Sequence, residues 1–149
     1  MRVVLSAVLA GVVFAPASPA QQKENPVDNK PVMPKLDAKE WKKLDSGMRV
    51  WDAKEGKGDE VKRGAKVKVH YTGWLTNGEI FDSSVVRKEP IEFGLTGVIK
   101  GWQDGIPGMK VGGRRQLICP PEFAYGPAGG GHRLSGRTLV FVIDLLGVK

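Results

Sequence analysis

Five aromatic side chains from separate segments are the strongest candidates for chemistry in this 149-residue chain: Tyr71, Phe81, Trp102, Tyr125 and Phe141. By composition alone, a plain hydrophobic core explains them better than a site does. Two observations favour a ligand pocket. Buried phenolic hydroxyls need hydrogen-bond partners, and Asp82 directly follows Phe81 in an otherwise apolar strand, where a carboxylate must be hydrogen-bonded or paired. An apolar cup with a few polar groups at its edge is typical of a ligand-binding site.

The other patterns that carry chemistry are incomplete. His70 and His132 are the only histidines, and no cysteine or carboxylate stands at ligand spacing beside either, so the sequence predicts no metal site. Ser83 and Ser84 lack the Gly-x-Ser-x-Gly context of a strained nucleophile turn. The glycine-rich segment 126–131 lacks the Gly-Lys-Ser/Thr ending of a phosphate loop and precedes a strand. We therefore expect no cofactor.

The segments around the aromatic residues are expected to be short strands and one short helix. Residues 65–71 alternate between apolar and polar side chains, as in a strand with one buried face. Asn77-Gly78 is typical of a hairpin turn. Within 98–109, apolar residues recur at four-residue spacing, in a helix that glycines weaken and Pro107 ends. Residues 138–148 form a last, mostly buried strand. These elements predict an α+β fold in which a strongly curved antiparallel sheet wraps around one short α-helix.

The start of the chain has the layout of a secretory signal peptide over residues 1–20, with cleavage after Ala20 and Ala17 as a competing position. Its apolar stretch is too short to span a bilayer comfortably, so we expect cleavage and no stable membrane insertion; an uncleaved anchor is the alternative. Export to a bacterial periplasm or the extracellular space follows from this interpretation. The single cysteine, Cys119, lies on an apolar strand and is interpreted as a small buried hydrophobe.

Residues 21–45 form a polar, proline-containing arm, in which residues 36–44 are compatible with two helical turns, and residues 46–149 form the folded domain. The 23 Lys and Arg residues exceed the 16 Asp and Glu residues, which gives a net charge of +7. These basic residues are dispersed and are not interleaved with aromatic residues, so we expect no nucleic-acid partner. The arm is short and rich in proline, which favours a monomer.

Four short motifs and a closing apolar run give the chain a resemblance to the FKBP-type peptidyl-prolyl cis-trans isomerases. The resemblance covers about residues 46–149, and its motifs are specific in combination although each is weak alone. They are His70-Tyr71-Thr72-Gly73, Phe81-Asp82-Ser83-Ser84, Val98-Ile99-Lys100-Gly101-Trp102, Ala124-Tyr125-Gly126 and Leu139-Val140-Phe141-Val142-Ile143.

The resemblance implies a pocket in which Trp102 is the floor beneath a proline ring. It implies that the Ile99 N–H and the Tyr125 hydroxyl bind ligand carbonyls, and that Asp82 orders the tyrosines and faces the twisted amide. The implied catalytic residues are Tyr71, Phe81, Asp82, Ile99, Trp102, Tyr125 and Phe141, and the implied substrate-binding residues are Ile91, Val98 and Leu134. The chain departs from the family before its last strand, where Leu134-Ser135-Gly136-Arg137 replaces a proline-containing tip and Leu134 stands in for an isoleucine.

The resemblance implies an enzyme that accelerates rotation of X-Pro bonds in exported proteins that are folding. Its expected partners are proline-containing polypeptides and macrolide inhibitors of the rapamycin and tacrolimus type. The alternative is a non-catalytic, chaperone-like module that holds proline segments or a partner in the same pocket. The altered tip before the last strand is the feature that favours this alternative.

Overall fold

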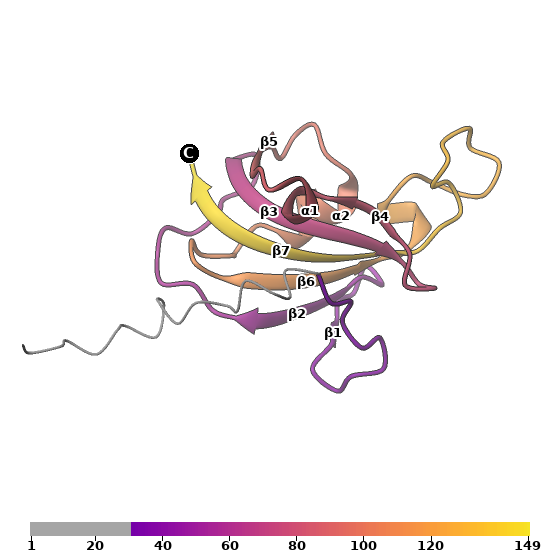
Figure 1. Ribbon diagram of the computed structural model, residues 1–149, viewed down its shortest axis with the longest axis horizontal. Helices are drawn as coiled ribbons and strands as arrows, with labels where there is room; N and C mark the ends of the chain where they lie inside the picture. Colours follow the sequence, from indigo (N-terminus) through magenta and orange to yellow (C-terminus); the bar gives the residue numbers. More distant parts are fainter. Residues whose placement is uncertain (1–30) are drawn as a thin grey trace, which may run out of the picture.

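The structure, a computed structural model, describes residues 31–149 (Figure 1). The expected signal peptide at 1–20 and the first part of the arm, 21–30, lie outside the described residues. No helix within the described part of the chain is long and apolar enough to cross a membrane.

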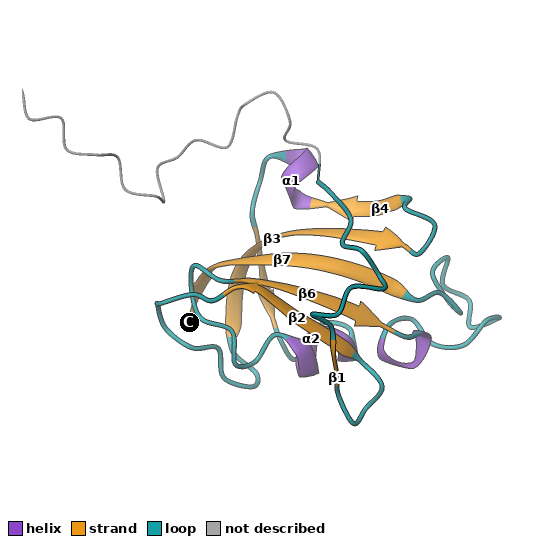
Figure 2. Ribbon diagram, turned by 90° about the horizontal axis from the view of Figure 1, so that it is seen from below, coloured by secondary structure: helices purple, strands orange, loops and turns teal. Residues whose placement is uncertain are grey.

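One seven-stranded antiparallel sheet forms the body of the molecule. The long strands β3 and β7 pair along their whole length, from Val67 opposite Val148 to Leu75 opposite Leu139, and both curve strongly (Figure 1). Figure 2 shows the order β1-β2-β6-β7-β3-β4 across the sheet, and β5 pairs with the start of β3. The strands are β1 (Lys42–Lys43), β2 (Arg49–Lys54), β3 (Lys66–Leu75), β4 (Ile80–Ser83), β5 (Ile91–Gly94), β6 (Arg114–Cys119) and β7 (Leu139–Val148).

The predicted hairpin is confirmed between β3 and β4. Gly78 has a φ of 91°, a conformation that glycine adopts without a steric penalty. The turn is closed by the Leu75 N–H, which donates to the Glu79 carbonyl at 2.8 Å, and by the Gly78 N–H, which donates to the Leu75 carbonyl at 3.0 Å. This turn places Phe81 and Asp82 directly beside β3.

The main helix, α2 (Lys100–Gly105), is short, as the sequence predicts, and lies against β6. Its glycines permit this close approach: a Cβ on Gly101 would lie 2.5 Å from the Cys119 Sγ, and one on Gly105 would lie 2.8 Å from a methyl carbon of Leu117. The glycines that weaken the helix thus set its distance from the sheet.

A single helical turn, α1 (Ser84–Arg87), was not expected from the sequence. It begins where the Ser83 Oγ accepts a hydrogen bond from the Val86 N–H, which is the arrangement of a helix N-cap. A 3₁₀ turn, η2 (Pro121–Phe123), follows β6. Apart from these turns, the predicted fold class of a curved antiparallel sheet around one short helix is confirmed.

The concave side of the sheet and α2 enclose the main core. Val67, Val69 and Tyr71 all point inward from β3, as the alternating pattern predicts. Cys119 is fully buried there, which confirms its interpretation as a small hydrophobe. Burial raises the pKa of its thiol to about 12, so the thiolate is not populated near neutral pH.

The convex side carries a second apolar cluster, which the arm covers. Trp74, Ile118 and Val140 are buried beneath Met33, Leu36 and Trp41. The helical turns predicted at 36–44 are wrong, because this segment instead pairs as β1 with β2 and packs its apolar side chains on the sheet. The Trp41 Nε1–H donates to the Lys35 carbonyl at 2.8 Å, and its ring meets Trp51 edge to face at 5.6 Å. Tertiary packing therefore overrides the weak local helix signal.

Candidate functional site

A cavity of about 290 Å³ lies between α2 and β4. We call the loop at 126–137, which directly follows the lining residue Tyr125, the flap. The lining of the cavity includes all seven residues that the sequence assigned to catalysis, together with Val98. Sequence reasoning missed two lining residues, Phe93 and Gly97. The complete lining is Tyr71, Phe81, Asp82, Phe93, Gly97, Val98, Ile99, Trp102, Tyr125 and Phe141.

Trp102, on α2, is one of the two most enclosed aromatic residues of the cavity. Only 4% of it is exposed, and three rings meet its indole edge to face, with centroid distances of 5.1 Å to Tyr71, 5.2 Å to Phe93 and 5.5 Å to Phe141. Aromatic rings prefer this arrangement because the positive edge of one faces the negative face of the other. Phe81 meets Phe141 in the same way at 5.6 Å. The rings thus hold each other in fixed orientations around an apolar floor.

Asp82 is held in a polar network at the edge of the cavity. The Tyr71 hydroxyl donates to one carboxylate oxygen and the Arg87 guanidinium donates to the other, while the Arg87 Nη2 lies 3.5 Å from the Tyr71 hydroxyl. Burial acts to raise the pKa of Asp82, but the hydrogen bonds from Tyr71 and Arg87 outweigh it and lower that pKa. Burial and the bond to Asp82 raise the pKa of Tyr71. Both groups therefore keep their ordinary charge states at neutral pH.

Arg87 is a site residue that sequence reasoning missed. It lies at the end of α1, and that single turn brings its side chain back onto Asp82, five residues earlier. The expectation that the tyrosines donate to Asp82 holds for Tyr71 only. Tyr125 instead stacks on His132, with ring centroids 3.9 Å apart and planes 6° apart.

The flap is anchored by a leucine. Leu134, which the sequence assigned to substrate contact, is only 4% exposed; it belongs to the main core and does not line the cavity. The flap closes on itself through the Gly136 N–H, which donates to the Gly126 carbonyl at 2.7 Å, and the Ser135 Oγ, which donates to the Tyr125 carbonyl at 3.2 Å. These contacts fix Tyr125 at the cavity mouth, where 38% of it is exposed.

Ile91 also lies behind the cavity. It is half-buried on β5, opposite Val69, and packs against the main core rather than lining the cavity. Ile99 ends the segment before α2, and its carbonyl accepts from the N–H groups of Trp102 and Gln103 at 3.0 Å and 3.2 Å. These bonds orient the Ile99 backbone at the start of the helix, next to the cavity.

The serines of the second motif have a structural role. The Ser84 Oγ is fully buried and accepts from the Tyr71 N–H at 2.8 Å, and the His70 Nδ1 lies 3.0 Å from it. The Ser83 Oγ lies 2.8 Å from the Thr72 Oγ1. These bonds join β4 and α1 to β3, so the motif residues around Tyr71 and Asp82 fix the two strands that carry them.

A sequence profile of the family described as FKBP-type peptidyl-prolyl cis-trans isomerase matches residues 57–146. The chain belongs to this family. A probable FK506-binding protein of Corynebacterium glutamicum is 62% identical over 92 residues, which cover 61% of this chain and 78% of that protein. A probable FKBP-type peptidyl-prolyl cis-trans isomerase of Haemophilus influenzae is 45% identical over 112 residues, which cover 74% of this chain but 46% of that protein.

Solved structures of the family have the same fold. FkpA from Escherichia coli superimposes with a TM-score of 0.70 at 42% identity, over 76% of this chain and 53% of that one. AtFKBP13 superimposes with a TM-score of 0.65 at 40% identity, over 74% of this chain and 99% of that one. This FKBP-type isomerase therefore spans about half of FkpA and of the Haemophilus relative, and nearly all of AtFKBP13.

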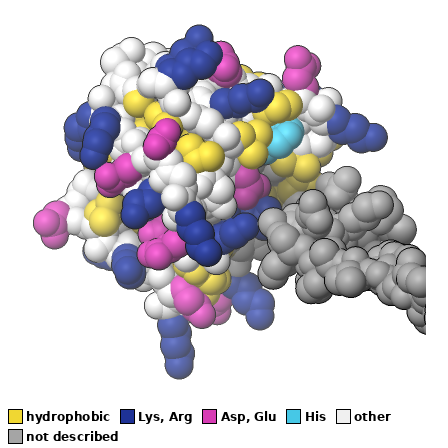
Figure 3. Space-filling model, turned by 90° about the vertical axis from the view of Figure 1, so that its left-hand side faces the viewer, with side chains coloured by type: hydrophobic (Ala, Val, Ile, Leu, Met, Phe, Trp, Pro, Cys, Tyr) yellow, Lys and Arg dark blue, Asp and Glu magenta, His cyan; other side chains and the backbone are white. Residues whose placement is uncertain are grey.

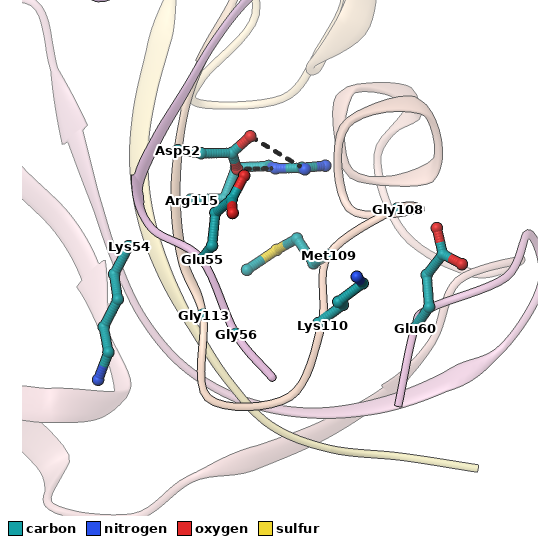
Figure 4. Close-up of a pocket in the computed structure, with 10 residues that line it drawn as sticks. All are labelled: Asp52, Lys54, Glu55, Gly56, Glu60, Gly108, Met109, Lys110, Gly113 and Arg115. Carbon is teal, nitrogen blue, oxygen red and sulfur yellow. Dashed lines mark hydrogen bonds and ion pairs between the residues drawn. The ribbon is translucent and has the colours of Figure 1, made fainter. Parts of the chain in front are cut away.

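A second cleft of about 270 Å³ lies between residues 52–60 and 108–115 of the isomerase (Figure 4). In contrast to the aromatic cavity, it is lined mainly by charged residues and glycines. Asp52 and Arg115 form a two-bonded ion pair across it, with a shortest distance of 2.6 Å. The Arg115 Nη1 also donates to the carbonyls of Gly105 and Pro107, at 2.9 Å and 3.1 Å. This arginine therefore ties the end of α2 to the sheet.

The described residues contain no group of three or more His, Cys, Asp or Glu side chains placed to hold a metal ion. On the face shown in Figure 3, Lys and Arg side chains are interspersed with Asp and Glu. The basic excess of the sequence is thus not gathered into one patch on that face. The aromatic cavity is therefore the candidate functional site.

Proposed function

We propose that the aromatic cavity is the site at which this FKBP-type isomerase accelerates rotation of X-Pro bonds, without covalent chemistry. One observation carries the proposal: the cavity has an aromatic floor in Trp102, and Asp82, the only carboxylate that lines it, is already bonded by Tyr71 and Arg87. Such a site offers an apolar surface to a pyrrolidine ring and has no free base.

The mechanism follows from the polarity of the amide. Rotation about the peptide bond has a barrier of about 18–20 kcal/mol, because the planar amide has partial double-bond character. Twisting the bond removes this resonance and leaves a carbonyl with less charge separation. An apolar cavity therefore binds the twisted state relatively better than water does, which lowers the barrier by differential binding of the transition state.

The proposed roles follow the placement of the side chains. Trp102 supports the proline ring, and Phe81, Ile99 and Phe141 form the walls, with Val98 beside them. The Ile99 N–H and the Tyr125 hydroxyl bind carbonyls of the bound chain. Asp82 acts through orientation and electrostatics and transfers no proton. Ile91 and Leu134 act from behind the lining, where Leu134 anchors the flap.

The proposed substrates are proline-containing segments of exported proteins. Support comes from the signal-peptide layout of residues 1–20 together with the isomerase fold. We propose inhibition by macrolides of the rapamycin and tacrolimus type, because relatives that are 45–62% identical include several named as FK506-binding proteins. The proline-free tip of the flap, residues 134–137, favours one other outcome, a chaperone-like module that binds proline segments without turnover.

The test is exchange NMR on an X-Pro peptide with the mature protein, with and without rapamycin. Acceleration that Phe81→Ala and Asp82→Val reduce and the macrolide inhibits would support the isomerase site. Asp144→Asn is the matched control, since Asp144 is also bonded by an arginine, Arg114, but lies away from the cavity. Macrolide binding without any acceleration would instead support the binding module.

A further inference from the structure

The flap carries a positive charge that contacts the backbone of a residue lining the cavity. Residues 126–137 include Arg133, Arg137 and His132 but no Asp or Glu. Arg133 is exposed, and its Nη2 donates to the main-chain carbonyl of Phe81 at 3.3 Å. Arg133 does not itself line the cavity, but this bond holds its guanidinium against the backbone of Phe81, a residue that does line it.

The charge of Arg133 is not compensated within residues 31–149, because no carboxylate lies within ion-pair distance of it there. Asp82, the carboxylate that lines the cavity, is paired with Arg87. A guanidinium has five N–H donors, and the bond to Phe81 occupies one of them. The other N–H groups of Arg133 can donate two parallel hydrogen bonds to a carboxylate, in a bidentate arrangement.

We propose that Arg133 is a specificity-determining residue, which favours proline segments that carry a glutamate or aspartate next to the proline. This inference rests on the proposed function of the cavity. The acidic side chain lies against the guanidinium while the proline ring occupies the cavity, so Arg133 contributes binding energy without touching the rotating bond.

The expected preference is moderate, because the ion pair is exposed. Pairs of this kind change kcat/KM by about 1.5- to 5-fold, and salt screens them. At 1 M ionic strength the Debye length falls to about 3 Å, so the preference should largely disappear there. A preference that arises from apolar packing would not respond to salt in this way.

The experiment measures kcat/KM by exchange NMR on matched peptides that differ only in the residue before the proline, which is Glu, Gln or Lys. A second series varies the residue after the proline. In at least one series, at low salt only, we expect kcat/KM for the Glu peptide to exceed that for the Gln peptide by about 1.5- to 5-fold. The value of kcat/KM for the Lys peptide should be below that for the Gln peptide. Arg133→Gln should bring the ratio of kcat/KM for the Glu peptide to that for the Lys peptide close to one. Arg133→Lys should keep most of the wild-type preference for the Glu peptide.

The control is Lys42→Gln, which removes the same charge from β1, at the sheet edge opposite β4, and should leave the ratio as in the wild type. Equal rates for the three peptides in both series, or a Glu preference that survives Arg133→Gln, would overturn the inference while the isomerase function stands. No acceleration of even the Gln peptide would refute the proposed function and this inference with it.

Discussion

Replacing Gly73 by alanine tests whether the position of the Phe81 ring controls activity. Gly73 lies on β3, opposite Asp82 of β4 and Phe141 of β7. A Cβ at this position would lie 2.4 Å from the Cζ of Phe81 and 2.9 Å from both of its Cε atoms, whereas ordinary contacts begin at 3.4 Å. The tip of the ring must therefore move by about 1 Å.

The direction of this movement follows from the packing. The Phe81 ring rests on the backbone of β3 at Gly73, so the added methyl group pushes it away from the sheet and into the cavity. Its edge contact with Phe141 is disturbed at the same time. Overpacking of this kind lowers the free energy of unfolding by about 1–3 kcal/mol. A shift of about 1 Å in a positioning group lowers kcat/KM by up to about 100-fold, so we expect a loss of about 10- to 100-fold.

The assay combines exchange NMR on an X-Pro peptide with urea unfolding. Gly94→Ala is the matched control, because Gly94 is also a strand glycine but a Cβ there would have no neighbour within 4 Å. Adding Phe81→Leu to Gly73→Ala removes the atoms that clash, so this double variant should regain stability without regaining the aromatic wall. Wild-type kcat/KM in Gly73→Ala, or an equal loss in Gly94→Ala, would refute the reasoning.

Three further outcomes are expected. The pKa of Asp82 is lowered in the folded state, so its contribution to stability is complete above its ordinary pKa of about 4 and is lost as the pH falls through the lower folded value. The value of kcat/KM should thus be constant from neutral pH to about pH 9 and fall in acid. The Arg87→Gln substitution should move that fall to higher pH. A kcat/KM maximum confined near neutral pH would contradict this expectation. Trp41→Ala should lower the free energy of unfolding, measured in urea, by about 1–3 kcal/mol, because Trp41 covers the convex cluster. It should change kcat/KM less than twofold. An unchanged free energy of unfolding would contradict the role of Trp41 in covering this cluster. Native Cys119 should not react with a thiol reagent at pH 8 but should react in urea, because burial raises its pKa to about 12; full reaction of the native protein would show that the site is open.

The strands could be predicted because their signals are local. Alternation over 65–71 assigns inward and outward faces before any tertiary contact is known, and Asn77-Gly78 fixes the hairpin that brings Phe81 to β3. The family motifs then identify the segments that contain the aromatic residues. Their convergence on Trp102 needed the resemblance to the family as well, because composition alone favoured a plain core.

The missed features depend on contacts between segments that no local pattern records. Arg87 reaches Asp82 only because α1 turns the chain back, and a four-residue helix is too short to show a periodicity. The arm looks polar by composition, yet three apolar residues in it cover the cluster around Trp74. Leu134 was expected to face the substrate, but an apolar side chain in a glycine-rich flap is more stable in the core, where burial provides the anchor that the missing prolines do not.

The polar groups of the cavity explain how an isomerase can work with one carboxylate and no base. A base at this site would need a pKa near the working pH. The hydrogen bonds from Tyr71 and Arg87 instead lower the pKa of Asp82. The network holds the Tyr71 ring against the Trp102 ring, with the ring centroids 5.1 Å apart and the ring planes nearly perpendicular. On the proposed mechanism, the charged groups therefore act by fixing the shape of an apolar surface, and that surface distinguishes the twisted amide from the planar one.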